Sequence, residues 1–209
     1  MNIEQPKFRR SKSVEEIRKE KEELYQVAKY CKNMRSFIFK ARYTNETLKE
    51  TEKFIQAKFP NQTGCIYCSS RELRSPHNTI PFGAPISVLE MNEETSEIVA
   101  IGFVINKPRM QKYAIHAENY KNTFNYIGKY RITREEMNEE EDCIMQVFEA
   151  ICFNGIFHLK HGLELNMFSP KLLWRAGRIV DLVAFVENMF RKRMCKNINI
   201  YENRTCDTL

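Results

Sequence analysis

The chain has 209 residues, of which 43% are hydrophobic and 29% are charged, and its formal net charge is +6. This length and composition predict a globular protein that buries a sizeable core, and they exclude a fibrous or low-complexity chain. No apolar stretch is long enough to span a membrane, and the N-terminus lacks the apolar centre of a secretory signal. We therefore expect no membrane partner and an intracellular location, in the cytoplasm or nucleus.

Charge is distributed unevenly along the sequence. Residues 1–60 carry six more basic than acidic side chains, whereas residues 133–155 carry six more acidic than basic ones. A basic N-terminal segment is suited to contact phosphates, but a solvated helix face or a contact with the chain's own acidic segment explains it at least as well. The charge pattern permits a nucleic-acid partner without requiring one.

The N-terminal part is predicted to be helical around one short strand. Residues 1–12 are basic and contain few large apolar side chains, so we expect a flexible arm. Ser13 and Glu16 have the spacing of a capping box, which predicts the start of a helix. Residues 36–42 favour a short strand, and residues 44–59 return to helical spacing until a proline ends the helix.

Short segments rich in β-branched and aromatic residues follow one another in the middle of the chain. Because turn-forming clusters and no helical patterns separate them, they predict a strongly bent, mostly antiparallel sheet or small barrel rather than a doubly wound parallel sheet. One segment, 97–105, is apolar on both faces, so we expect it to be central. The segments are residues 64–70, 85–91, 97–105, 112–117 and 124–132.

The C-terminal part is predicted to be helical again. Thr133 and Glu136 form a second capping-box pattern, which predicts a helix with acidic residues in its first turns. Ser169, followed by a proline, predicts the start of a long last helix over residues 170–194. The segment between the two helices is predicted to be irregular or a hairpin.

These elements predict the fold class α+β, with a small bent, mostly antiparallel sheet or barrel flanked by N- and C-terminal helices. We expect one α+β domain over residues 13–195, preceded by the basic arm 1–12 and followed by a loose tail at 196–209. The expected domain has three parts, which are a helical part (13–60), a β core (61–132) and the C-terminal helices (133–195).

Cysteine and histidine pairs raise the question of a zinc site. Cys65 and Cys68 have the spacing of a zinc knuckle, and His158 and His161 would complete a set of four ligands. However, no second cysteine pair follows, and residues three apart point to opposite faces of a strand. The irregular spacing of the seven cysteines favours reduced thiols. We therefore expect no metal and no cofactor.

Motifs of nucleophilic catalysis, glycine-rich phosphate loops and metalloprotease signatures are absent from the sequence. His77 lies in a predicted turn and His116 in a predicted strand, and an ordinary surface or core histidine explains either one more simply than a catalytic base does. An enzyme would need a pocket that joins His116 or His158 to carboxylates. We assign no catalytic residue, and the sequence favours a non-catalytic protein.

Basic and aromatic residues are interleaved across the predicted sheet. Nucleic-acid binders use this combination, with cations on phosphates and aromatic faces on bases. The alternative is an aromatic core with basic side chains extending from its rim. The hypothesis assigns phosphate contacts to Arg71, Arg74, Lys107, Arg109 and Lys112, and stacking faces to Tyr67, Tyr113 and Tyr126.

The predicted sheet also resembles a known superfamily. GCIYCSSREL has the pattern of an opening strand followed by polar residues, and PISVLEMNEETSEIVAIGFVINKP that of a strand, a charged turn and a return strand containing a small residue. This arrangement is similar to the PUA-like superfamily of small bent barrels, which includes the EVE, ASCH and YTH domains. The resemblance implies a pocket that reads a modified or flipped base, with Ser69, Ser70 and Arg71 near its mouth. The cage tryptophans of YTH-type readers have no counterpart, because the single tryptophan, Trp174, lies in the predicted last helix.

The segments GKYRI and FNGIFHLKHG, on either side of the acidic helix, are similar in style to uncharacterised proteins of large double-stranded DNA viruses. We therefore interpret the chain as a non-catalytic nucleic-acid-binding module for DNA or RNA, with a PUA-like base reader as the finer form of this interpretation. The alternative is a structural or assembly protein, for example a virion component, that acts through a protein partner or self-association.

Overall fold

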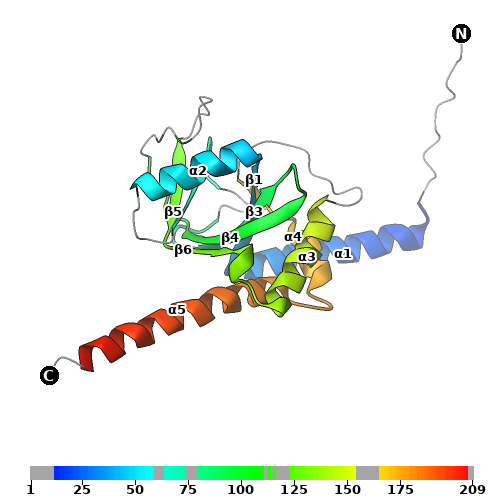
Figure 1. Ribbon diagram of the computed structural model, residues 1–209. Coiled ribbons are helices and arrows are strands. Elements are labelled where there is room, and N and C mark those ends of the chain that lie inside the picture. Colours follow the sequence, from blue (N-terminus) through cyan, green and yellow to red (C-terminus); the bar gives the residue numbers. More distant parts are fainter. Residues whose placement is uncertain are drawn as a thin grey trace, which may run out of the picture. The chain divides into compact units, whose positions relative to one another are not determined.

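The structure is a computed structural model that describes residues 12–58, 64–73, 80–110, 113, 115, 123–153 and 165–206, with side chains of the last helix described to residue 195. In chain order the elements are α1 (Val14–Asn33), β1 (Phe37–Tyr43), α2 (Asn45–Lys58), β2 (Cys65–Ser69), β3 (Pro85–Asn92), β4 (Glu97–Ile105), β5 (Phe124–Gly128), β6 (Tyr130–Thr133), the 3-10 helix η1 (Arg134–Glu136), α3 (Glu139–Phe153), β7 (Asn166–Met167), α4 (Pro170–Ala176) and α5 (Leu182–Cys206). Along the described residues, strands β2 to β6 follow one another without an intervening helix, and the helices stand before and after them, so the predicted α+β class is confirmed (Figure 1).

The chain divides into two compact units, Met1–Met34 and Arg35–Leu209. The first contains α1, and its predicted capping box is confirmed. Ser13 Oγ accepts from the amide of Glu16 at 3.2 Å, while Glu16 Oε2 accepts from the amide of Ser13 at 2.7 Å. These two bonds satisfy amides that the first turn of a helix leaves without partners, which explains why the helix begins at this point.

The second unit is built on a five-stranded sheet with the order β6-β4-β3-β1-β7. β1 and β3 are parallel, with α2 and β2 between them in the sequence, and the other neighbouring strands are antiparallel. The expected mostly antiparallel character is therefore correct, although the sheet is mixed. The described strands do not close into a barrel. β4 is an interior strand between β3 and β6, as its apolar sequence predicted.

A second, two-stranded sheet pairs β2 with β5 in antiparallel register, and Arg109 adds a bridge to Asn125 on the outer side of β5. The predicted strand 124–132 is split into β5 and β6. The split follows Gly128, where a Cβ atom would collide with the carbonyl oxygen of Phe103 on β4. Glycine thus lets the chain pass closely over β4 as it leaves the small sheet and joins the large one.

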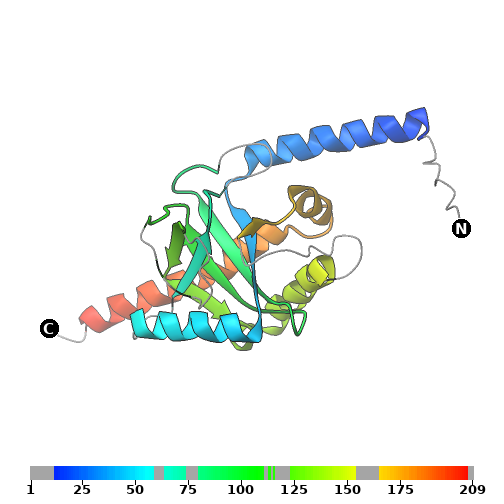
Figure 2. The same cartoon turned by 90° about the horizontal axis from the view of Figure 1, so that it is seen from above.

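Helices cover both faces of the five-stranded sheet (Figures 1 and 2). α2 and the small sheet lie over one face, where Glu52 of α2 approaches Arg131 of β6. α3 and α5 lie over the other face, and Phe190 of α5 packs on Phe103 of β4 with ring centroids 5.2 Å apart. Burial on both faces explains why β1 and β3 have nearly continuous runs of buried residues.

Two of the C-terminal helices, α3 and α5, begin at side-chain caps. The capping box of Thr133 and Glu136 forms but precedes only η1, because Asn138 caps α3: its Oδ1 accepts from the amide of Glu141 at 2.9 Å. The predicted helix 170–194 is interrupted after Ala176. α5 starts anew beside Asp181, whose carboxylate accepts from the amides of Val183 and Ala184 at 3.1 Å.

Two expected segments differ from the structure or lie outside it. The backbone of α5 continues as a helix to Cys206, so the predicted loose tail at 196–209 is helical over most of its length. Of the predicted strand 112–117, only Tyr113 and Ile115 are described, and neither is in a strand. Among the described residues, no helix combines the length and the apolar character needed to cross a membrane.

Candidate nucleic-acid interface

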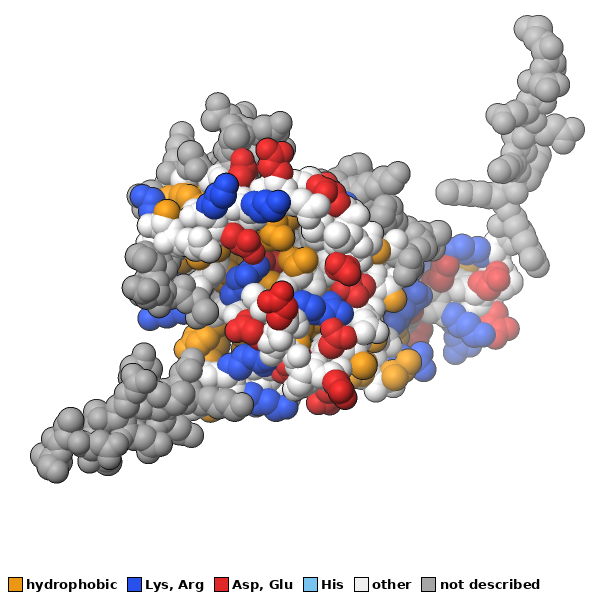
Figure 3. All heavy atoms as spheres, viewed as in Figure 1, with side chains coloured by type: hydrophobic (Ala, Val, Ile, Leu, Met, Phe, Trp, Pro, Cys, Tyr) orange, Lys and Arg blue, Asp and Glu red, His pale blue; other side chains and the backbone are white. Residues whose placement is uncertain are grey.

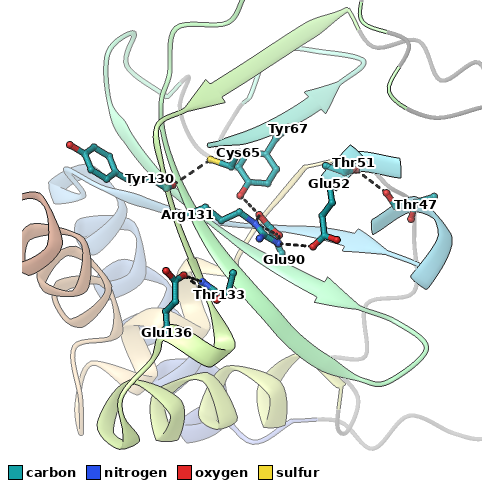
Figure 4. A network of polar contacts seen from close by, with 10 residues as sticks. All are labelled: Thr47, Thr51, Glu52, Cys65, Tyr67, Glu90, Tyr130, Arg131, Thr133 and Glu136. Carbon is teal, nitrogen blue, oxygen red and sulfur yellow. Dashed lines mark hydrogen bonds and ion pairs between the residues drawn. The ribbon is translucent and has the colours of Figure 1, made fainter. Parts of the chain in front are cut away.

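A buried polar network ties the small sheet to the large one (Figure 4). Its centre is Glu90 on β3, which is 4% exposed. The Tyr67 hydroxyl donates to Glu90 Oε1 at 2.7 Å, and Arg131 donates through Nε to both carboxylate oxygens at 3.0 Å and through NH2 to Oε2 at 2.7 Å. Glu52 lies 3.8 Å from the same guanidinium. The buried carboxylate is thus held by a bidentate cation and a phenol.

Burial governs how the groups of this network ionise. Burial raises the pKa of Tyr67 well above its ordinary value, and the neighbouring Cys65 and Glu90 raise it further, so the phenol remains a neutral donor. Burial alone would lower the pKa of Arg131, but the charge and hydrogen bonds of Glu90 outweigh it and raise that pKa. Gly102 lies against this cluster, and a Cβ there would collide with the Tyr67 hydroxyl and come within 2.9 Å of Cys65 Sγ.

A polar cleft of about 470 Å³ lies between α2, β4, β6 and α3. Its basic groups are already paired: Arg131 with Glu90, and Arg134 with Asp142 and, at 2.6 Å, with Glu149. Side chains of both signs are intermingled on this face (Figure 3). The acids outnumber the bases in the lining, which repels the phosphates of a nucleic acid. The lining residues are Glu52, Glu97, Ile98, Val99, Arg131, Thr133, Arg134, Glu135, Asp142 and Glu149.

Two of the three tyrosines assigned to base stacking belong to the core instead. Tyr67 is 2% exposed and Tyr126 is not exposed at all. The hydroxyl of Tyr126 accepts from the amide of Leu73 at 3.3 Å, so both phenols serve buried polar groups. With the small sheet packed on the large one, neither ring has a face open to a base. Tyr113 is half-buried, and its ring meets Phe54 edge to face at 5.6 Å.

Three of the predicted phosphate contacts are exposed, and two of them, Arg71 and Arg109, lie at the same end of the small sheet. Arg109 exchanges backbone hydrogen bonds of 2.8 and 3.0 Å with Asn125, which pairs with Cys68 of β2. Because both pairings with β5 are antiparallel, the chain at Arg109 runs parallel to β2. Arg71, which follows β2, and Lys107 and Arg109 all have exposed side chains. Arg74 and Lys112 lie outside the described residues.

The serines expected at a pocket mouth differ from each other. Ser69 is 3% exposed, and its hydroxyl donates to the carbonyl oxygen of Arg71 at 2.6 Å. This bond closes the turn that follows β2 and leaves the Ser69 side chain inside the protein. Ser70 is exposed.

Two apolar side chains beside these cations were not predicted from the sequence. Phe82 is 77% exposed and Met110 is 74% exposed. Lys107 Nζ lies 5.8 Å from the centroid of the Phe82 ring, and the amide of Gly83 donates to the carbonyl oxygen of Asn106 at 3.0 Å, which holds the two loops together. The signal was present in IPFGAP, where an aromatic residue stands in a turn-forming context. We call the set Arg71, Phe82, Lys107, Arg109 and Met110 the basic rim.

The described cysteines are free, as expected for reduced thiols. Cys65 is buried, and burial raises its pKa to about 12. Cys68 Sγ lies 2.9 Å from the side-chain oxygen of Asn125. No group of three metal-ligand residue types comes together among the described residues, and His77, His116, His158 and His161 all lie outside them.

Comparisons of the chain with protein-family models, curated proteins and solved structures find no match.

Proposed function

We propose that the protein binds single-stranded nucleic acid, DNA or RNA, through the basic rim. The observation that carries this proposal is the largely exposed ring of Phe82 with Lys107 beside it. An exposed aromatic face provides a stacking surface for an unpaired base, and adjacent cations provide contacts for the phosphates on either side. A duplex hides its base faces, so the rim favours single strands.

Other surfaces support the proposal less well. The polar cleft is acidic, and its guanidinium groups are already bound to carboxylates. Arg109 and Lys107, by contrast, are exposed on a segment that also presents Met110. The finer proposal of a PUA-like reader, in which a modified or flipped base enters a pocket, stays a prediction, because it needs an aromatic wall other than Tyr67 and Tyr126.

Fluorescence anisotropy with labelled single- and double-stranded DNA and RNA at two salt concentrations tests the proposal. We expect salt-sensitive binding with preference for single strands. Phe82→Ala should remove about 1–3 kcal/mol of binding free energy, as expected for one stacked base. The double variant Lys107→Gln/Arg109→Gln should reduce the salt slope by about 0.7 for each phosphate that the variant no longer neutralises.

Matched controls come from elements that contribute no residue to the rim. Tyr25 of α1 is 64% exposed and Lys49 of α2 is exposed, so Tyr25→Ala and Lys49→Gln remove an aromatic ring and a charge of the same kinds. Both controls should bind like the parent protein. Absence of binding at low salt, or equal weakening in the rim and control variants, would contradict the proposal.

A second candidate function, assembly through protein contacts, is favoured by α1. The helix begins at a complete capping box, yet it leaves apolar side chains uncovered: Val14 is 84% exposed and Leu24 is 60% exposed. Val14, Ile17, Leu24 and Cys31 recur at the a and d spacing of a heptad repeat, which suits a self-complementary helix pair. Concentration-dependent mass in light scattering without nucleic acid, abolished by Leu24→Glu, would support this function. A monomer at all concentrations would contradict it.

A further inference from the structure

Two basic side chains lie inside the protein on β1. Lys40 is 4% exposed and Arg42 is 7% exposed. Because they are two residues apart on one strand, they share a face of the five-stranded sheet. Burial of a cation without a counter-ion is strongly unfavourable, and burial of two neighbouring cations is more so.

The strands beside β1 provide no charge to balance these cations. Lys40 is in register with Leu89 of β3 and with Asn166 of β7, and Arg42 is in register with Met91. Residues in register point to the same face of a sheet, so the two cations have apolar neighbours on β3. Asn166, on the edge strand, is exposed, which places Lys40 one strand away from solvent.

Nearby carboxylates are committed to other partners. Glu90 is in register with Ala41, so it lies on the opposite face of the sheet. Glu149 of α3 accepts through Oε1 from Arg134 at 2.6 Å and from the amide of Ile98 at 2.7 Å.

The side chains of Lys40 and Arg42 also lack a partner for their polar atoms in the part of the chain that the structure describes. Within the described residues, neither Lys40 nor Arg42 has a hydrogen bond or ion pair, and Arg42 Nε is fully buried without an acceptor. Burial lowers the pKa of Lys40; the neighbouring Cys152 opposes this effect and Arg42 adds to it. Burial raises the pKa of Cys152 to about 11, so its thiol stays neutral.

We propose that Lys40 and Arg42 form a binding site for a phosphoryl group, as free phosphate or as a phosphate monoester. A phosphoryl dianion balances both cations, and its oxygens supply acceptors for the guanidinium and the ammonium together. A monocarboxylate would leave one buried charge unbalanced. The site is built from β1 and faces α3, so it does not depend on the basic rim.

Calorimetric titration of the full chain with inorganic phosphate and with a nucleoside 5′-monophosphate, at constant ionic strength, tests the site. Binding of either ligand supports it. Tighter binding of the monophosphate identifies a phosphate ester as the ligand class, and tighter binding of inorganic phosphate identifies the free anion. If neither ligand binds the parent protein at millimolar concentration, the proposal is overturned.

Variants of Lys40 and Arg42 distinguish phosphate binding at this site from a general effect of the salt on the protein. Lys40→Met and Arg42→Met should each weaken phosphate binding on the order of tenfold or more. Lys40→Met should also unfold at a higher temperature than the parent protein in phosphate-free buffer, because it removes an unbalanced buried charge. The exposed control Lys49→Met should change neither property, and Phe82→Ala should leave phosphate binding intact even if it abolishes nucleic-acid binding.

Two results would overturn the proposal whatever the fate of individual variants. One is a phosphate-dependent rise in unfolding temperature that is equal in the parent, Lys40→Met and Lys49→Met proteins, which indicates exclusion of phosphate from the surface. The other is lower stability of Lys40→Met without phosphate, together with unchanged phosphate affinity. If Lys40→Met does not fold, line broadening of the phosphate ³¹P signal by the parent protein decides the question.

Discussion

At the scale of single residues, environment separates side chains that look alike in the sequence. Tyr67 and Tyr126 were predicted to offer stacking faces, but each uses its hydroxyl to satisfy a buried group, Glu90 in one case and the amide of Leu73 in the other. Phe82 has no hydroxyl to satisfy a buried group, and its ring is exposed. Alternation along a strand indicates that two faces exist, but it does not tell which face another sheet covers.

The first prediction concerns the buried pair of Glu90 and Arg131. Arg131→Met should lower the free energy of unfolding by about 3–5 kcal/mol, because it leaves a buried carboxylate without its cation. Glu52→Gln, which removes the outer and half-exposed partner of the same guanidinium, should cost about 1 kcal/mol or less. Urea unfolding of both variants measures their free energies of unfolding. Similar losses for the two would show that burial does not determine how much the pair of Glu90 and Arg131 contributes to stability.

At the scale of elements, side-chain caps mark where helices begin, but the cap that the helix uses can lie further along the chain than the pattern recognised in the sequence. α1 begins at the predicted box, whereas α3 begins one cap later, at Asn138, and α5 begins beside Asp181. An ion pair then joins α3 to α5. Arg193 of α5 donates through NH1 and NH2 to the carboxylate of Glu141 of α3, at 2.7 and 2.8 Å. Neither the sequence spacing nor the caps predicted this contact.

The second prediction is a pH dependence of this contact between α3 and α5. The hydrogen bond from Arg193 lowers the pKa of Glu141 below its ordinary value of 4.5, although burial opposes the change. A depressed pKa means that the carboxylate contributes stability above about pH 4.5, and that this contribution disappears as the pH falls through the lower pKa of the folded state.

The measurement is urea unfolding from neutral pH to below pH 4 for the parent protein and Glu141→Gln. The variant should be less stable at neutral pH, and the difference between the two proteins should shrink as the pH falls. A difference that stays constant across this range would show that Glu141 is not ionised in the contact with Arg193.

At the scale of the whole molecule, the five-stranded sheet and its covering helices all belong to the unit Arg35–Leu209. α1 belongs to the other unit, Met1–Met34. The expectation of one domain over 13–195 stays untested by this division, since compactness does not measure cooperativity.

The third prediction is that residues 35–209 fold without the first unit. We expect the truncated chain to unfold cooperatively and with a stability close to that of the full chain, because the five-stranded sheet and the helices that cover it all lie within this unit. Circular dichroism during urea unfolding provides the measurement, with the full chain as its control. A broad, non-cooperative transition would show that α1 is an integral part of the core.

The sequence by itself determined the elements that depend on neighbours within a few residues. Alternation of apolar and basic residues predicted β1, runs rich in β-branched and aromatic residues predicted β2, β3 and β4, and the capping box of Ser13 predicted the start of α1. These features depend on backbone preferences and on hydrogen bonds that span three residues, so a short window of sequence is enough to predict them.

Only the tertiary structure decided which polar and aromatic groups meet. Tyr67 reaches Glu90 across 23 positions and Arg131 reaches it across 41. The parallel pairing of β1 with β3 places Lys40 and Arg42 beneath α3, and the bridge of Arg109 to Asn125 brings that cation to the same end of the small sheet as Arg71. Such contacts depend on how elements pack, and no periodicity in the sequence encodes them.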